Sequence, residues 1–125
     1  MPKAAVGVCM NIAAIERLTE ATFDAQASSG HVLVEFGATW CMPCRMLEPV
    51  IRQLAASYTG RVRVMTVDTD EETALVTRFS VSTVPTILVL QDGEVTRRFV
   101  GLTTYKRLAQ AIETTSMTDE NATGT

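Results

Sequence analysis

One near-continuous apolar run, HVLVEF at residues 31–36, is followed by a segment whose apolar residues are spaced quite differently. A continuous apolar run of this length is typical of a strand that is buried on both faces of a sheet. From Met42 onward the apolar residues recur at spacings of one, three or four, which predicts an amphipathic helix that ends at Gly60. Pro49 lies inside this helix and is expected to interrupt and kink it. The apolar stripe of the helix consists of Met46, Leu47, Val50, Ile51, Leu54 and Tyr58.

A second strand, RVRVMTVD at residues 61–68, follows this helix. Residues 31–68 therefore form one strand–helix–strand unit, which is expected to be parallel and right-handed. Two further strands, TILVL at residues 86–90 and EVTRRFV at residues 94–100, flank an Asp-Gly pair that is typical of a hairpin turn. A parallel unit followed by an antiparallel hairpin predicts an α/β fold whose helices cover both faces of the sheet.

Shorter elements complete the pattern. Residues 12–18 are expected to form a short first strand, and Thr19 to cap a helix that ends near Ala27, before a Ser-Ser-Gly break. Residues 71–79 predict another short helix. One face of a last helix is marked by Tyr105, Leu108 and Ile112.

The chain is expected to hold one domain, because 125 residues leave room for a single core. We place this domain at residues 14–113, between an N-terminal extension of residues 1–13 and a disordered polar tail of residues 114–125. The extension has one lysine, a weakly apolar stretch and no clear small-x-small cleavage site, so it does not resemble a targeting signal.

Charge and hydropathy narrow the classes of function. The net charge is −3 and no Lys/Arg run occurs, so no nucleic-acid-binding surface is expected. No apolar run is long enough to span a bilayer, so no membrane partner is expected either. Because the N-terminal extension does not resemble a targeting signal, we expect a cytoplasmic protein, and we assume a monomer.

The chain has three cysteines, and two of them stand in WCMPC at residues 40–44. A zinc site needs four ligands, and only Cys9 and His31 remain beside this pair, without the paired spacing of zinc ligands, so no metal is expected. A purely structural disulfide is also disfavoured, because a bridge across two residues closes too small a loop to constrain much. A Cys-x-x-Cys pair near a strand–helix–strand pattern instead indicates a redox-active dithiol. Cys9 is expected to be a semi-exposed thiol, with a regulatory role such as glutathionylation or dimerisation as the alternative.

Cys41 and Cys44 lie where the buried strand gives way to the helix. The N-terminus of a helix offers unpaired backbone N–H groups and the positive end of its dipole, and both stabilise a thiolate, the nucleophile in disulfide exchange. Cys41, at the start of the helix, should benefit most. Cys44, about one turn later, should be more covered and placed to attack Cys41 from within.

Several motifs together resemble the thioredoxin family, over roughly residues 14–113. They are VLVEFGATWCMPCRMLEP at residues 32–49, TVPT at residues 83–86, the Asp92-Gly93 turn and Gly101. The resemblance implies a thioredoxin fold, in which a central mixed sheet of about five strands is flanked by four helices. It also implies a thiol-disulfide oxidoreductase that reduces protein disulfides through a mixed-disulfide intermediate, without a bound cofactor.

The same resemblance implies a role for each matching residue. Cys41 would be the attacking thiolate, and Cys44 would resolve the mixed disulfide. Pro85 would hold a cis peptide after Val84, whose backbone would bind the substrate as an added strand. The substrate-binding surface around them would consist of Trp40, Met42, Pro43, Val67, Thr83, Val84, Val100 and Gly101.

Glu35 is the one acid inside the apolar strand run. A charge at such a position is costly unless it is satisfied or protonated, although a place at a sheet edge would relieve it. Glu35 matches the family's buried aspartate, so our hypothesis is that it acts as general acid/base for Cys44, a task that suits a raised pKa.

Four departures from the family pattern put the redox potential in question. Met42 replaces the usual glycine between the cysteines, and Glu35 is one methylene longer than the usual aspartate. Val64 stands where the family commonly has a lysine, so Glu35 should be harder to ionise. Gly37 stands where a second tryptophan is usual.

The expected partners are disulfide-containing substrate proteins and a flavoprotein that resembles thioredoxin reductase. Two alternatives stay open. The chain would be a more oxidising oxidant or isomerase with the same fold, or a non-catalytic binding or chaperone module that docks partners around Trp40. The intact cysteine pair argues against the module, which has no need of two thiols.

Overall fold

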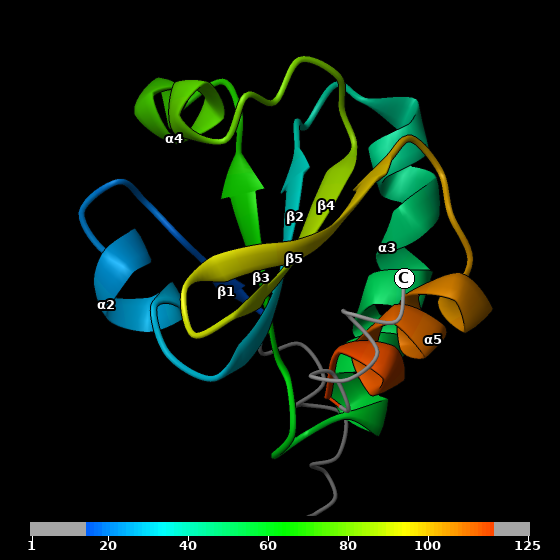
Figure 1. Ribbon diagram of the computed structural model, residues 1–125. Coiled ribbons are helices and arrows are strands. Elements are labelled where there is room, and N and C mark those ends of the chain that lie inside the picture. Colours follow the sequence, from blue (N-terminus) through cyan, green and yellow to red (C-terminus); the bar gives the residue numbers. More distant parts are fainter. Residues whose placement is uncertain (1–14, 117–125) are drawn as a thin grey trace, which may run out of the picture.

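The computed structural model describes residues 15–116, and within them a five-stranded mixed sheet lies between two layers of helices (Figure 1). The strands lie side by side in the order β1-β3-β2-β4-β5. They are β1 Glu16–Arg17, β2 His31–Gly37, β3 Arg63–Asp68, β4 Thr86–Gln91 and β5 Glu94–Val100. The helices are α2 Phe23–Ala27, α3 Met42–Ser57, α4 Thr73–Arg78 and α5 Tyr105–Ser116. The expected α/β fold is therefore confirmed.

The pairing of the strands follows the predicted pattern. β2 runs parallel to β3 and antiparallel to β4, and β4 pairs antiparallel with β5. Asp92 and Gly93 connect this hairpin with φ values of 50° and 88°, as a two-residue turn between twisted strands requires. Because β2 and β3 are parallel, their carboxyl ends meet at one edge of the sheet. There the N–H of Thr69 donates to the carbonyl of Gly37 at 2.9 Å.

The side chains of β2 alternate between two cores, because successive residues of a strand point to opposite faces. Val32, Val34 and Phe36 are fully buried in the core that also holds Phe23 of α2 and Leu75 of α4. Leu33 belongs to the other core, with Leu47, Ile51 and Leu54 of α3 and Leu108 and Ile112 of α5. By this alternation Glu35 lies on the same face of the sheet as Leu33, under α3.

Two predicted boundaries near the N-terminal half are wrong. Thr19 does not begin a helix, because it and Thr22 bond to each other in a turn and α2 starts only at Phe23. Residues 61–62 do not open β3, since the N–H of Val62 bonds to the Tyr58 carbonyl and closes the turn after α3. Of the predicted first strand at residues 12–18, the described part pairs with β3 at residues 16–17.

α3 runs through Pro49 without a break, so the predicted interruption is wrong. The proline removes one backbone hydrogen bond, but the buried face of the helix extends across it through Leu47, Ile51 and Leu54. Packing of that face on the sheet holds both halves of the helix in place.

α5 continues to Ser116, so residues 114–116 of the predicted polar tail are helical. The remainder of that tail, the N-terminal extension and Cys9 lie outside the described residues. None of the helices within residues 15–116 is long and apolar enough to cross a membrane.

Candidate active site

Cys41 and Cys44 form a disulfide at the N-terminus of α3. Cys41 is the N-cap residue, with an extended backbone (φ −88°, ψ 113°), and the N–H of Cys44 donates to its Sγ at 3.2 Å. Pro43 lies in the first turn, where a missing N–H removes no helical hydrogen bond. The sulfur of Cys41 therefore lies at the positive end of the helix, where a thiolate is stabilised.

Both cysteines are buried, with 3% of Cys41 and 6% of Cys44 exposed. The expectation that Cys44 would be the more covered of the two is therefore wrong in this disulfide-bonded state. The reason is that each cysteine borders a different hollow. Cys41 borders one of about 570 Å³, and Cys44 borders another of about 640 Å³.

A proline loop borders the same hollow as Cys41. The Val84–Pro85 peptide is cis, as the resemblance implies. The hydroxyl of Thr86 donates to the Thr83 carbonyl at 2.6 Å, and the N–H of Gly101 donates to the Pro85 carbonyl at 2.8 Å. These bonds join the loop to the segment that follows β5, so Gly101 lies beside it.

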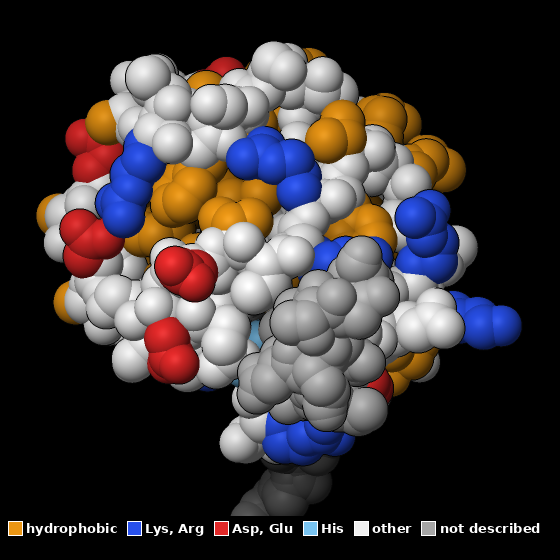
Figure 2. All heavy atoms as spheres, viewed as in Figure 1, with side chains coloured by type: hydrophobic (Ala, Val, Ile, Leu, Met, Phe, Trp, Pro, Cys, Tyr) orange, Lys and Arg blue, Asp and Glu red, His pale blue; other side chains and the backbone are white. Residues whose placement is uncertain are grey.

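Most of the predicted substrate-binding residues gather around this first hollow, which is bordered by Trp40, Met42, Pro43, Thr83 and Val84. Val100 lies nearby at the end of β5 and is 59% exposed. In Figure 2, hydrophobic side chains gather at the upper right, over the N-terminal end of α3 and the segment that follows β5 in Figure 1. We call the residues Trp40, Met42, Pro43, Thr83, Val84, Val100 and Gly101 the docking surface.

Val67 does not belong to the docking surface, so its predicted place there is wrong. It is only 2% exposed, packs in the core with α2 and α4, and borders the hollow of Cys44 instead. Met46 was predicted to lie in the apolar stripe of the helix, but it is 59% exposed, so its place in that stripe is wrong. Leu102, also exposed, is a large hydrophobic residue that the sequence pattern did not assign to any surface.

Asp70 is a site residue that the sequence pattern did not reveal. Trp40 is 68% exposed, and its Nε1–H donates to Asp70 Oδ2 at 2.8 Å, which orients the indole beside the first hollow. Asp70 lies two residues beyond β3, and the carboxyl ends of parallel strands meet at one edge. That topology is the signal that could have found it.

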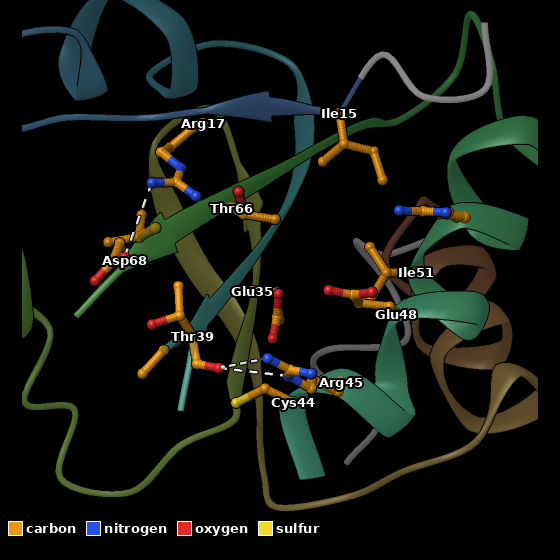
Figure 3. A pocket seen from close by; sticks show the side chains of 14 residues that line it. Ile15, Arg17, Glu35, Thr39, Cys44, Arg45, Glu48, Ile51, Thr66 and Asp68 are labelled. Atoms are coloured by element: carbon orange, nitrogen blue, oxygen red, sulfur yellow. Dashed lines mark hydrogen bonds and ion pairs between the residues drawn. The ribbon is translucent and has the colours of Figure 1, made fainter. Parts of the chain in front are cut away.

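Glu35 lies on the other side of the disulfide, in the hollow that Cys44 borders (Figure 3). It is 8% exposed, and its carboxyl group makes no hydrogen bond with any residue of the described chain. A Cβ built on Gly37 would lie 2.8 Å from Glu35 Oε2 and 3.2 Å from Cys44 Sγ. The carboxyl group and the sulfur therefore flank the same small space above Gly37.

The electrostatics of Glu35 favour its protonated form. Burial, and then the negative charge of Glu48, raises the pKa of Glu35 to about 7. Val64, where the family commonly has a lysine, is buried in the core and supplies no compensating charge. The expectation that Glu35 would be buried and harder to ionise is confirmed. A carboxyl group with such a pKa exchanges protons readily near neutral pH.

The fold and the site define a class of protein: an α/β domain that carries a disulfide between two closely spaced cysteines at a helix N-terminus, beside a cis-proline loop. The thioredoxin family model matches residues 14–114. The chain is 40% identical over 100 residues to the thioredoxin of Staphylococcus saprophyticus subsp. saprophyticus, and 38% identical over 100 residues to that of Staphylococcus aureus. Both alignments cover 80% of this chain and 96% of the relative.

The chain therefore belongs to the thioredoxin family. It is a thiol-disulfide oxidoreductase, a protein-disulfide reductase whose redox centre is the Cys41–Cys44 pair. Neither the comparisons nor the site favours the oxidant, isomerase or non-catalytic alternatives. Membership also implies, in general terms, disulfide-containing substrate proteins and a reductase that restores the dithiol.

Proposed function

We propose that Cys41 attacks the substrate disulfide and that Cys44 resolves the mixed disulfide. The observation that carries this assignment is the hydrogen bond from the Cys44 N–H to Cys41 Sγ at the N-terminus of α3. Such a bond stabilises the Cys41 sulfur as a thiolate, both when it attacks and when it later leaves.

In the first step a bond forms between Cys41 Sγ and one substrate sulfur, and the other substrate sulfur leaves as a thiolate and takes up a proton. In the second step the Cys44 thiolate attacks Cys41 Sγ, forms the internal disulfide and releases the second substrate sulfur. Two electrons pass from the cysteine pair to the substrate, so no further cofactor is required.

Glu35 accepts the proton of the Cys44 thiol before this second step. Its support is the shared space above Gly37, where the Glu35 carboxyl group and Cys44 Sγ lie within 3.2 Å of one position. A carboxyl group with a pKa of about 7 is able both to take that proton and to return it.

The docking surface binds the substrate around the disulfide, and the backbone of Val84 pairs with the substrate as a short added strand. Exposed Trp40, Met42 and Val100 supply the apolar contacts, at 68%, 62% and 59% exposure. The protein acts as a monomer, which leaves these side chains free for substrates. A thioredoxin-reductase-like flavoprotein restores the dithiol in the cytoplasm, where thiols are kept reduced.

The order of the two cysteines is tested by trapping the intermediate. A reduced Cys44→Ser variant incubated with intact, disulfide-bonded insulin should accumulate a mixed disulfide between Cys41 and an insulin chain, visible as a mass adduct that added thiol removes. A Cys41→Ser variant should accumulate far less under the same conditions. Equal trapping by both variants, or trapping through Cys44 alone, would contradict the assignment.

The direction of the reaction is tested by equilibrating the protein in glutathione buffers of graded ratio and counting the free thiols of Cys41 and Cys44. A strongly reducing midpoint supports a general disulfide reductase. A markedly more oxidising midpoint would show that Met42 and Glu35 have retuned the pair toward disulfide formation or isomerisation.

A further inference from the structure

The hollow that Cys44 borders is not part of the docking surface. It holds about 640 Å³, within the range of sites for small molecules, and Cys41 is not among the residues that line it. The hollow of the docking surface shows the reverse, because Cys41 lines it and Cys44 does not. Each sulfur of the disulfide is therefore approached from a different space.

Gly37 leaves the way to Cys44 open within this hollow. A Cβ at position 37 would lie 3.2 Å from Cys44 Sγ, so any side chain there would cover the sulfur. With glycine, no side chain of residue 37 covers the sulfur, and the group that lies in this space is the Glu35 carboxyl group, 2.8 Å from that Cβ position. Figure 3 shows Cys44 and Glu35 at the same end of it, with Glu48 and Ile51 of α3 along one wall.

Three arginines line the hollow, and two of them have no acidic partner in the described part of the chain. Arg17 lies 3.8 Å from both Asp68 and Glu71. The guanidinium group of Arg45 donates to the Thr39 carbonyl, at 3.3 and 3.4 Å, and to no acidic side chain of the described residues (Figure 3). The guanidinium group of Arg52 makes no hydrogen bond or ion pair with any described residue, and the side chain is exposed.

The acids of the hollow do not cancel these two guanidinium groups. Asp68 faces Arg17. Glu48 carries one negative charge, and Glu35 is only partly ionised near neutral pH because burial raises its pKa to about 7. The guanidinium groups of Arg45 and Arg52 are therefore opposed by one fully charged acid, Glu48. This excess of positive charge favours a ligand that carries a carboxylate.

We propose that this hollow binds a small thiol that bears a carboxylate group and delivers it to Cys44. The proposal rests on the redox role of the Cys41–Cys44 pair and adds a second class of electron donor to it. Arg52 and Arg45 bind the carboxylate, while the thiol end of the molecule reaches the sulfur beside Gly37.

The reaction balances with two molecules of the thiol. The first loses its proton to the Glu35 carboxylate and attacks Cys44 Sγ. The Cys41–Cys44 bond breaks, and Cys41 leaves as a thiolate at the helix N-terminus, where the Cys44 N–H already donates to it. A second small thiolate attacks the sulfur of the bound one, so that Cys44 is released as a thiolate and a small disulfide departs. Both cysteines end reduced, and two thiols end oxidised to one disulfide.

The test uses the oxidised full chain and three small thiols of similar size: mercaptopropionate, mercaptoethanol and cysteamine. The rate of reduction of the internal disulfide is measured for each and divided by the rate at which the same thiol reduces a small uncharged disulfide, hydroxyethyl disulfide, which cancels differences in thiol pKa and in thiolate nucleophilicity. The net charge of −3 alone would make cationic cysteamine the fastest and the anion the slowest. The proposal expects the reverse order.

Two matched variants locate the effect. Arg52→Gln should slow reduction of the internal disulfide by mercaptopropionate about threefold, the size expected for one exposed charge contact. It should leave the rate of reduction by mercaptoethanol unchanged. Lys106→Gln makes the same change of charge at an exposed position that does not line the hollow, and should alter neither rate. An order that follows net charge, or equal effects of both variants, would overturn the proposal.

Insulin reduction by the same proteins separates this inference from the proposed function. If the wild type and both variants reduce insulin equally but show no preference for the anionic thiol, the hollow is not a thiol site and the role of the cysteine pair stands. If none of them reduces insulin, the proposed function itself fails.

Discussion

The carboxyl group of Glu35 occupies the space that any side chain at position 37 would need. A Cβ on Gly37 would lie 2.8 Å from Glu35 Oε2, closer than such atoms approach in proteins. Glu35 is longer than the family's usual aspartate, and Gly37 replaces its usual tryptophan. These two departures from the family pattern are therefore coupled through packing. The longer side chain carries its carboxyl group into room that the glycine leaves.

The first prediction concerns this pair. Gly37→Ala should lower the free energy of unfolding by about 1 kcal/mol, the low end of the cost of overpacking, because the crowded Glu35 carboxyl group is the end of a flexible side chain and can shift. The backbone at Gly37 is not left-handed, so the loss comes from contacts and not from strain. Urea unfolding of the oxidised protein measures it.

The matched control is the same substitution in a Glu35→Asp background, where the shorter acid makes room for the new methyl group. There Gly37→Ala should cost less than half as much. A cost that is the same in both backgrounds would mean that the two positions do not compete for space.

The second prediction follows from the pKa of Glu35. Its folded value of about 7 lies above the ordinary value of 4.5, so the folded protein holds a proton that the unfolded chain releases between these pH values. Stability contributed by this group is present below pH 4.5, falls as the pH rises, and is lost above about 7. A difference of this size corresponds to about 3 kcal/mol. Glu35→Gln should remove this fall, so the variant should gain stability over the wild type between pH 5 and pH 8.

Chemical denaturation across that pH range checks the second prediction, with Glu48→Gln as the control. Glu48 raises the pKa of Glu35 less than burial does. The Glu48→Gln variant should therefore still lose stability as the pH rises, with that loss displaced slightly to lower pH. If the wild type and Glu35→Gln depend on pH alike, Glu35 does not titrate in this range.

Much of the fold could be predicted from the sequence because it depends on the local spacing of apolar and turn residues. The apolar run of β2, the stripe of α3 and the Asp92-Gly93 turn each depend on residues that are neighbours in sequence. The burial of Glu35 follows from the same run. Its approach to the space above Gly37 does not, because alternation places both on one face but says nothing of the distance to Cys44.

Other features depend on residues that only the tertiary fold brings together. The N-terminus of α4 is capped by Glu20, whose Oε2 accepts from the N–H of Ala74 at 3.0 Å across 54 positions of sequence. Val67 was misplaced for a related reason. A residue at the end of a parallel strand borders either of two hollows, and the side on which it lies depends on the register with β2.

The third prediction concerns the bond between Trp40 and Asp70. Asp70→Ala should free the indole, which is the only tryptophan of the chain and therefore reports its own mobility by fluorescence anisotropy. The anisotropy should fall, and KM for a protein disulfide should rise roughly fivefold, as expected for about 1 kcal/mol of lost positioning. The rate at which iodoacetamide alkylates reduced Cys41 should stay within twofold of the wild-type rate, because the small reagent needs no docking surface.

Asp70→Asn keeps an oxygen acceptor but removes the charge, so it separates an effect of the hydrogen bond from an effect of the charge. Rescue by Asn shows that the hydrogen bond orients the docking surface, whereas an equal loss in both variants would assign the effect to charge.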